Sequence, residues 1–454
     1  MSNTFKDFLS QLLKKDNFSE DTITKAKWII IDTVVAGLYG IKTEEPLQNY
    51  INRLRDKSDS QHNTIPIMGT NIQTSIKNST IIHGTAIVSN ELDEGNTFAK
   101  GHPAAHLLPT MLASAIENNA TGTEFIRAFI LGYEASARLA YASRMKDYMH
   151  PHGTWGNVGG TVAAGILAKK KNEDIVEAAM LSATLPLATT WQAAEKGITA
   201  RNLYTGIGTY LAYEALELQS YGFKSSTHVV DDIWSNIMSD GFDDLKLFEE
   251  LFSPPLVEKN YFKLYPSCRF THGAIDALNN LIKEGPIEIE DIKEITVETY
   301  SLAARCKNPI PKTPLEAKFS IPFMLSTLLH GTSLYKTNEN NILFNSSIQS
   351  LSTKIKVLES SELTAMLPKN RTTRVTIRFK DNRQKSNTVY TASGEYSLPF
   401  EKEKLVEKYN SMLQDHYPSN LLVNLMQSTF ELETYTSILE WVDTFSLIKV
   451  SENE

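Results

Sequence analysis

Hydrophobic positions in the first part of the chain recur three and four residues apart, a spacing typical of amphipathic helices. The first such segment has its apolar positions at Phe5, Phe8, Leu9, Leu12 and Leu13. A second helix is expected to begin near Ser19 and is apolar nearly all round after Trp28, which predicts a central core helix. Gly37 and Gly40 are expected to mark its end.

The same pattern predicts further helices before residue 220. They are expected at residues 74–89, 109–119, 123–141, 156–170, 175–190 and 203–218. Pro109 suits the first position of its helix, because that position leaves the backbone N–H without a partner and proline has none. Pro186 is expected to bend the helix over 175–190. This part of the chain is therefore predicted to be helical throughout.

From residue 294 onward, short segments rich in β-branched residues replace the helical spacing. Strands are predicted at residues 294–300, 354–358, 374–379 and 388–391, with an apolar helix at 319–329 between them. A polar turn that begins at Lys380 is expected to join the last two strands into a hairpin. These elements predict an α+β segment with a small antiparallel sheet. The helical pattern then returns and ends with a helix at 431–448.

Three polar segments lie between the apolar elements and contain most of the reactive or charged residues that are candidates for a functional site. The first spans residues 91–106, the second 148–156 and the third 263–272. Polar groups between buried elements are costly to bury without partners, so three such segments indicate a site. The candidates are Asp93, Thr97 and His102 from the first, His150 and His152 from the second, and Lys263, Cys268, Arg269 and His272 from the third. Lys196 and Arg201 are expected to form a fourth wall of the same site.

A pocket with several histidines, lysines and an arginine suits a small di- or tricarboxylate. Lysine and arginine bind carboxylates, and histidine, whose ordinary pKa is about 6.5, moves protons near neutral pH. A proton removed beside a carboxylate leaves charge that aimed donors must stabilise. No metal needs to be invoked, because the histidines and carboxylates show no tight ligand spacing. Cys268 is either a nucleophile near Arg269 and His272 or an ordinary packed cysteine, and the packed cysteine is favoured.

Composition and charge narrow the function classes. The chain has 454 residues, 41% of them hydrophobic and 22% charged, which fits a globular protein of two or more domains. A net charge of −8, without a stripe of basic residues, argues against nucleic acid as the main partner. No apolar run reaches the roughly 18 residues of a membrane span, and the N-terminus lacks the features of a signal peptide. The only cysteines, Cys268 and Cys306, argue against a disulfide framework and for a reducing cytoplasm.

Four segments carry a resemblance to a known family: ELDEGNTFAKGHPAAHLLP, HPHGTWGNVGGTVAAGILAKK, KLYPSCRFTHGAIDAL and AKFSIPFML. They look like an Asp-x-x-x-Thr pattern with a His-Pro step, a His-x-x-Gly-Thr segment, a Tyr-Pro-Ser-Cys-Arg segment and a Lys-Phe-Ser-aliphatic-Pro signature. The family that they resemble is MmgE/PrpD, which includes 2-methylcitrate dehydratase, cis-aconitate decarboxylase and iminodisuccinate epimerase. Their order and spread extend over most of the chain.

The resemblance implies a mainly α fold. A large all-helical domain would comprise residues 1–257 and 400–454, and a smaller α+β lid domain of residues 258–399 would be inserted, with the site in the cleft. Members of the family are typically homodimers without a cofactor. By the same resemblance, active-site positions of decarboxylase-like members correspond to Asp93, Thr97, His102, His150, Lys196 and Lys263. The chain departs from some decarboxylase and dehydratase relatives at Cys268, where they carry a histidine.

Together these observations favour a cofactor-independent lyase that dehydrates or decarboxylates a small di- or tricarboxylate such as 2-methylcitrate or cis-aconitate. The expected roles are acid–base work or carboxylate contact for His102 and His150, orientation of a histidine for Asp93, and carboxylate binding for Lys196, Lys263 and Arg269. An epimerase or racemase of a related dicarboxylate is the alternative, and it needs two opposed bases. A non-catalytic helical binding protein is the third hypothesis.

Overall fold

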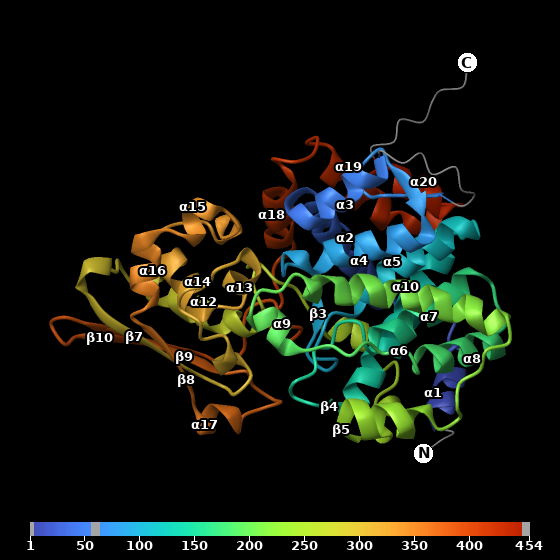
Figure 1. Ribbon diagram of the computed structural model, residues 1–454, viewed down its shortest axis with the longest axis horizontal. Helices are drawn as coiled ribbons and strands as arrows, with labels where there is room; N and C mark the ends of the chain where they lie inside the picture. The colour runs from blue at the N-terminus through green and yellow to red at the C-terminus, as the bar shows by residue number, and fades with distance from the viewer. Residues whose placement is uncertain (1–3, 56–63, 447–454) are drawn as a thin grey trace.

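The computed structural model of the protein describes residues 4–55 and 64–446, and most of its elements are helices, as predicted. Figure 1 shows a larger helical body, made from the first half of the chain and its C-terminal helices, beside a smaller body that contains the four-stranded sheet. The prediction of a mainly α protein is therefore confirmed. The domain boundaries after residues 257 and 399, and the role of the smaller body as a lid, stay predictions.

The larger body contains fourteen named α-helices among the described residues. They are α1 (Thr4–Leu12), α2 (Glu20–Thr43), α3 (Glu45–Arg55), α4 (Ile76–Ser89), α5 (Pro103–Glu117), α6 (Gly122–Ala142), α7 (Gly156–Leu167), α8 (Asn172–Ser182), α9 (Trp191–Glu195), α10 (Ala200–Ser220), α11 (Leu245–Phe248), α18 (Lys402–Leu413), α19 (Leu421–Phe430) and α20 (Ile438–Asp443). The C-terminal helices α18 and α19 pack against α2, so the two ends of the chain share one core.

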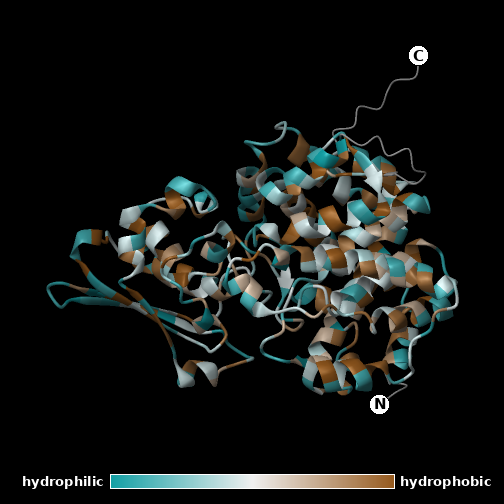
Figure 2. Cartoon of the chain, viewed as in Figure 1, coloured by the Kyte–Doolittle hydropathy of each residue, from teal (hydrophilic) through white to brown (hydrophobic). Residues whose placement is uncertain are grey.

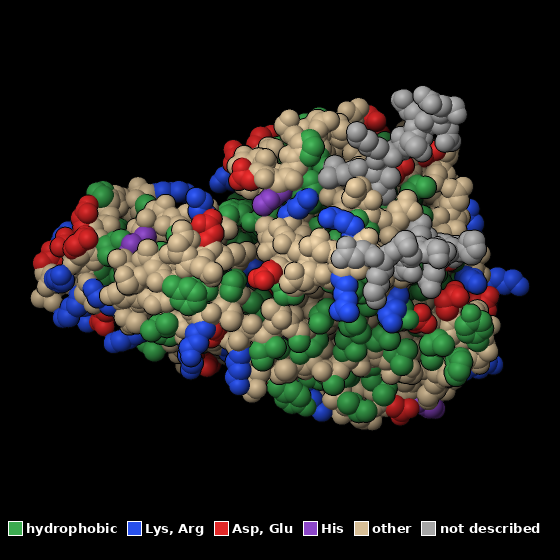
Figure 3. Space-filling model, turned by 45° about the horizontal axis from the view of Figure 1, so that its top comes forward, with side chains coloured by type: hydrophobic (Ala, Val, Ile, Leu, Met, Phe, Trp, Pro, Cys, Tyr) green, Lys and Arg blue, Asp and Glu red, His purple; other side chains and the backbone are tan. Residues whose placement is uncertain are grey.

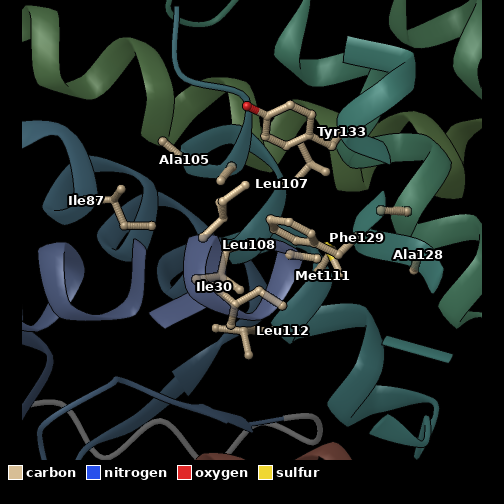
Figure 4. Packing of buried hydrophobic residues seen from close by; sticks show 14 of the residues in the cluster. Ile30, Ile87, Ala105, Leu107, Leu108, Met111, Leu112, Ala128, Phe129 and Tyr133 are labelled. Atoms are coloured by element: carbon tan, nitrogen blue, oxygen red, sulfur yellow. The ribbon is translucent and has the colours of Figure 1, made fainter. Parts of the chain in front are cut away.

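The core of the larger body lies where α2, α4, α5 and α6 meet. Figure 4 shows Ile30, Ile87, Leu108, Met111 and Phe129 from these four helices packed together, and all five side chains are fully buried. Burying each such side chain contributes roughly 1.5–3 kcal/mol. Figure 2, which colours each residue by its hydropathy, shows many hydrophobic residues along the helices of this body.

Helix α2 is the predicted core helix, since every residue from Ala26 to Ile41 is buried. The Ser19 hydroxyl caps its start by accepting a hydrogen bond from the Thr22 N–H at 3.1 Å. The prediction that it ends at Gly37 and Gly40 is wrong, because the helix continues to Thr43. A Cβ atom at Gly40 would lie 2.0 Å from the carbonyl oxygen of Ala86 on α4, so this glycine permits close helix packing.

Other helix boundaries also differ from the predictions. Helix α5 begins at Pro103 and not at Pro109, because the Glu94 carboxyl accepts a hydrogen bond from the Ala104 N–H at 2.9 Å and so satisfies an N–H group of the first turn. Helix α8 ends at Ser182, because the N–H groups of Thr184 and Leu185 bond to carbonyls only three residues back, which ends the helical pattern ahead of Pro186. In the described part of the predicted 431–448 helix, α20 follows a 3-10 turn at Leu432–Thr434.

The smaller body is built on a sheet with strand order β10-β9-β7-β8. Its strands are β7 (Ile292–Thr299), β8 (Ile355–Glu359), β9 (Thr373–Phe379) and β10 (Gln384–Val389), and β9 and β10 form the predicted hairpin. The prediction of an antiparallel sheet is wrong, because β7 and β8 run parallel. A parallel pair needs a crossover connection, and here that connection contains α13 (Pro314–Lys318), α14 (Ile321–Leu329), α15 (Asn340–Leu343) and α16 (Ser346–Ser352).

The two faces of this sheet have different surroundings. Ile295, Val297, Val375 and Ile377 alternate along β7 and β9 and pack into a core with α12 (Arg269–Lys283) and α14, which lie on one side of the sheet in Figure 1. On the other face, charged side chains pair across strands, as in the 3.1 Å contact between Arg378 and Glu294. The remaining short helix, α17 (Ser361–Thr364), follows β8.

Pairs of short strands fix where distant segments of the larger body meet. In one pair, β3 (Gly95–Asn96) from the first polar segment lies antiparallel to β6 (Asn260–Tyr261), just before Lys263. In another, β4 (Ser143–Met145) pairs with β5 (Ser239–Phe242). The third pair is β1 (Thr64–Pro66) with β2 (Gln73–Ser75). The β3–β6 pair therefore brings the first and third polar segments together.

The surface has no single dominant charge on the face that Figure 3 shows. There, Lys and Arg side chains are interspersed with Asp and Glu, and hydrophobic side chains gather on the lower part of the larger body. Within residues 4–55 and 64–446, no helix combines the length and the apolar character that crossing a membrane requires.

Candidate active site

Two neighbouring cavities lie where the polar segments converge. The inner chamber, of about 390 Å³, is lined by residues of all three segments, among them His102, His150, His152, Cys268 and Arg269. The outer chamber, of about 710 Å³, shares part of its wall with the inner one. The shared residues are Thr97, Lys100, Ser143, Arg269, Pro368 and Arg371. We call this shared wall the throat.

His102 is held by the backbone and a carboxylate of its own segment. Its Nδ1 lies 2.6 Å from the carbonyl oxygen of Glu94, to which it donates, and 3.0 Å from Oδ2 of Asp93. In the neutral form of the ring, with the proton on Nδ1, the Nε2 atom carries a lone pair, and Nε2 makes no hydrogen bond with any described residue. The side chain is 10% exposed, and the residue lines the inner chamber. His102 is thus placed to exchange a proton with a bound molecule.

Asp93 belongs to a buried cluster of charges beneath His102. Lys263 Nζ lies 3.4 Å from carboxylate oxygens of both Glu91 and Asp93, and Arg201 donates to the other oxygen of Glu91. Burial alone would raise the pKa of Asp93, but the nearby charges of His102 and Lys263 outweigh it and hold that pKa well below its usual range. The pKa of Glu91 is lowered too, because Arg201 and Lys263 outweigh its burial. Both carboxylates are therefore ionised.

The backbone of this cluster is strained at Glu91, and Lys408 hydrogen-bonds to it at Leu92. Glu91 has φ 54°, a left-handed conformation that a side chain disfavours by about 1 kcal/mol. The next carbonyl, that of Leu92, accepts a hydrogen bond from Lys408 Nζ at 2.8 Å. Lys408 on α18 also pairs with Asp32 on α2 inside the core. Burial raises the pKa of Asp32 and lowers that of Lys408, and each partner's charge opposes the effect. This ion pair fixes the segment that carries Glu91 and Asp93.

His106 has a structural role next to the site. Its Nδ1 is 2.9 Å from the His102 carbonyl oxygen and its Nε2 accepts a hydrogen bond from the Gly153 N–H at 3.0 Å, which fixes a neutral tautomer. Burial lowers the pKa of His106 to about 4. A Cβ atom at Gly156 would lie 2.3 Å from the His106 ring, so only glycine lets α7 begin there. The first and second polar segments are thereby locked together.

His150 lines the inner chamber and carries a hydrogen-bond donor that has no partner among the described residues. Its Nδ1 accepts a hydrogen bond from the His152 N–H at 3.2 Å, so the neutral ring carries its proton on Nε2. That buried Nε2 has no hydrogen-bond partner among the described residues. Burial, with Arg201 nearby, holds the pKa of His150 well below its ordinary value, so the ring is neutral. The ring lies 4.4 Å from the Trp191 ring, centroid to centroid.

His152 lies among the other histidines of the site. Its ring centroid is 5.3 Å from that of His102, 5.4 Å from that of His106 and 4.5 Å from that of His150. Neither of its buried ring nitrogens has a hydrogen-bond partner among the described residues. Burial holds its pKa well below the ordinary value. His152 is therefore a second neutral ring that lines the inner chamber with unpartnered ring nitrogens.

Arg269 and Thr97 meet at the throat through a shared carboxylate. Thr97 donates to Glu395 at 2.8 Å, and Arg269 lies 3.3 Å from the other oxygen of the same carboxylate. Arg269 also donates to the Ala392 and Ser393 carbonyls at 3.0 and 2.9 Å, which occupies its guanidinium. His272 lies behind Arg269, 3.3 Å away, and lines neither chamber.

Cys268 lines the inner chamber, whereas Cys306 does not. A hydrogen bond with Cys268, followed by burial, raises the pKa of the Cys306 thiol well above its ordinary value. Both cysteines are buried and both are free thiols. Their burial in hydrophobic clusters agrees with the packed cysteine that the sequence favours over a nucleophile.

Two predicted site lysines lie away from the chamber walls. Lys263 is completely buried and faces Glu91 and Asp93, so its charge is already balanced by protein carboxylates. Lys196 is exposed at the end of α9 and lines neither chamber. Their correspondence to active-site positions of the resembled family stays a prediction.

Other cations near the site were not among the predicted candidates. Lys100 and Arg371 are part of the throat. Lys318 is buried and donates to the Ser89 carbonyl at 2.9 Å, and its burial lowers its pKa to about 8. A signal for Lys318 exists in the sequence, since this lysine stands in the apolar AKFSIPFML segment. No pattern around Arg371 distinguishes it from a surface arginine.

A metal site is not apparent in the donor arrangement. Over residues 4–55 and 64–446, no group of three or more His, Cys, Asp or Glu side chains is arranged to hold a metal ion. Instead, His102, His106 and His150 each bond to a backbone group through a ring nitrogen.

Comparisons with known proteins agree with the resemblance seen in the sequence. The model of the MmgE/PrpD N-terminal domain matches residues 4–244, and that of the MmgE/PrpD C-terminal domain matches residues 265–431. The chain is 21% identical to the cis-aconitate decarboxylase-like protein oryM of Aspergillus oryzae, over 94% of each chain. It is 24% identical to the human cis-aconitate decarboxylase over 70% of this chain and 68% of that protein. Identity to the cis-aconitate decarboxylase of Aspergillus terreus is 22%, over 94% and 93% of the two chains.

Proposed function

This chain belongs to the MmgE/PrpD family, and from that premise we propose that it is a lyase that decarboxylates or dehydrates a small di- or tricarboxylate. The observation that carries the proposal is the pairing of His102 with Asp93 at the wall of a chamber that also holds neutral histidine donors. Such a pairing supports proton transfer near neutral pH. The proposed chemistry uses these side chains and requires no cofactor.

His102 is the proposed proton-transfer group. Asp93 stabilises the imidazolium form, and Nδ1 stays engaged with Asp93 and the Glu94 carbonyl while Nε2 gains or loses a proton. In a dehydration, Nε2 removes the proton next to a carboxylate, the carbon–oxygen bond breaks, and the departing hydroxide takes a proton from solvent and leaves as water. In a decarboxylation, the bond between the carboxylate carbon and the carbon skeleton breaks, and carbon dioxide leaves. The electron pair of that bond stays on the skeleton and accepts a proton from Nε2. A positioned group of this kind contributes typically 10²–10⁴-fold to a rate.

His150 is proposed to stabilise negative charge on the substrate. The ring lines the chamber, its buried Nε2–H group has no acceptor among the described residues, and a neutral ring donates a hydrogen bond without releasing its proton. The same tautomer leaves Nε2 without a lone pair, so His150 is a poor base. For this reason the geometry favours a lyase over the two-base epimerase that was the alternative.

cis-Aconitate is the first substrate to test, because the relatives at 21–24% identity carry cis-aconitate decarboxylase in their names. Purified protein would be incubated with cis-aconitate, 2-methylcitrate and citrate in parallel, and products followed by proton NMR. We expect turnover of at least one of the three with release of carbon dioxide or water. Complete absence of turnover for all three would remove this substrate class from the proposal.

The homodimer expected from the family resemblance is also a proposal. Sedimentation equilibrium of the purified protein is expected to give about twice the 50.9 kDa mass of one chain. A mass equal to that of one chain at micromolar concentration would contradict it.

A further inference from the structure

The throat between the two chambers is formed by cations from different parts of the chain. Lys100 belongs to the first polar segment of the larger body, and Arg371 precedes strand β9 of the smaller body. Both line the inner and the outer chamber, so a molecule that passes or spans the throat meets both side chains. Asp147, which also lines the inner chamber, is an acidic group whose charge acts to raise the pKa of Lys100.

Most other cations of the site are occupied by protein acceptors. Arg201 donates to Glu91 and to the Val88 carbonyl, and Arg269 is held by Glu395 and two carbonyl oxygens. Lys263 is balanced by Glu91 and Asp93. In contrast, Lys100 and Arg371 have no side-chain hydrogen bond and no ion pair with the described residues. The same holds for Lys146, which lines only the inner chamber, and for Lys369, which lines only the outer one. The free positive charge of the cavity is therefore concentrated at and beside the throat.

Lys100 is held in place by its backbone. It has φ 54°, a left-handed conformation that costs a non-glycine residue about 1 kcal/mol and persists only where the surroundings fix it. Although its side chain remains in contact with solvent, partial burial and the charge of Arg371 lower the pKa of Lys100. An anion bound between the two cations would relieve their repulsion.

We propose that Lys100 and Arg371 form a carboxylate subsite at the throat, which binds a substrate carboxylate remote from the reacting carbon at His102. The subsite makes the protein select tricarboxylates over dicarboxylates of the same chain length. It rests on the proposed function, because it assigns the substrate class of that same cavity. A carboxylate bound there would contact a side chain from each of the two bodies.

Binding of unreactive acids tests the subsite without any turnover. Propane-1,2,3-tricarboxylate and pentanedioate have the same carbon chain and differ in one carboxylate, and neither has a hydroxyl group or a double bond to react. Isothermal titration calorimetry is expected to show that the wild-type protein binds the tricarboxylate about tenfold more tightly or better. Arg371→Met and Lys100→Met are each expected to reduce that preference by about tenfold, mainly through the tricarboxylate.

Lys369→Met is the matched control. Lys369 is exposed, lines only the outer chamber and carries the same charge, so its loss is expected to leave the preference unchanged within about threefold. Arg371→Lys, which keeps the charge, is expected to retain part of the preference and so guards against an effect of misfolding. A preference that survives both Arg371→Met and Lys100→Met, or that is lost only in Lys146→Met, would overturn the subsite.

Failure of the subsite and failure of the proposed function give different results. Absence of turnover with the binding preference intact would refute the lyase and keep the subsite. Turnover with a preference that does not depend on Lys100 or Arg371 would refute the subsite and keep the lyase.

Discussion

Nδ1 of His102 lies 3.0 Å from Oδ2 of Asp93, nine residues earlier in the same polar segment. The contact exists because the strand pair β3–β6 and the start of α5 fold the segment back on itself. Beneath it, Lys263 and Arg201 keep the carboxylates of this cluster ionised. The arrangement therefore supplies a negative charge that stabilises a protonated His102.

Asp93→Asn is expected to lower kcat by about 10²–10⁴-fold, because an amide cannot stabilise the imidazolium form of His102. The variant keeps the size of the side chain, so its melting temperature should stay close to that of the wild type. The measurement is kcat against pH with a substrate that the wild-type protein turns over. A kcat within threefold of the wild type would show that Asp93 does not act through His102.

Lys263→Met is expected to destabilise the fold by about 3–5 kcal/mol, because it leaves two buried carboxylates without their shared cation. Urea unfolding gives the free energy. Lys293→Met on the exposed side of β7 removes the same charge from the surface and should change the free energy by less than about 0.5 kcal/mol. Equal effects of the two substitutions would mean that the buried cluster contributes nothing to stability.

Apolar spacing in the sequence predicts where helices lie better than it predicts where they end or how strands pair. Apolar spacing located α2 and α6 within a few residues, because both helices lie against the core over most of their length. The end of α2 was predicted wrongly, since Gly40 is used for contact with α4 and not for termination. The parallel pairing of β7 with β8 was missed, because a strand's own residues do not reveal which neighbour it takes.

For the site, the concentration of polar residues found the right segments but not the partners of each side chain. From the sequence, Lys263 is predicted to bind substrate. In the structure its neighbours are Glu91 and Asp93, which the β3–β6 pairing brings near it. Lys196 adjoins an apolar helix but lies on the exposed end of α9. Arg371 has no local signal, because its proposed role depends on lining the same two chambers as Lys100, which is far away in the sequence.

Lys408→Met is expected to lower the free energy of unfolding by about 3–5 kcal/mol, because the buried Asp32 carboxyl would lose the cation that pairs with it. Adding Asp32→Leu should restore most of the loss, since an apolar pair can replace a buried ion pair. The double variant should nevertheless have a reduced kcat, because the Leu92 carbonyl between Glu91 and Asp93 loses its donor. A double variant with wild-type kcat would show that Lys408 does not position this segment.

Glu94 makes stability depend on pH. Burial raises its pKa from 4.5 to about 8, so the folded protein keeps the carboxyl protonated while the unfolded chain ionises. This contribution to stability is fully present below about pH 4.5 and is lost as the pH rises to about 8, with a slope of up to about 1.4 kcal/mol per pH unit.

Glu94→Gln mimics the protonated acid and removes that dependence. We expect the variant to match the wild type near pH 5 and to be more stable at pH 8, as measured by urea unfolding across this range. Parallel profiles for the two proteins would mean that Glu94 is ionised in the folded state.

The central claim is that His102 transfers a proton between solvent and a carbon of the bound acid. The most direct measurement is the turnover of cis-aconitate in D₂O by the wild-type protein, His102→Gln and the surface control His228→Gln, followed by NMR and mass spectrometry. The account predicts carbon dioxide release with one deuterium in each product molecule for the wild type and the control. It also predicts a loss of at least about 10²-fold in His102→Gln. Wild-type turnover and deuterium incorporation that persist in His102→Gln would contradict it.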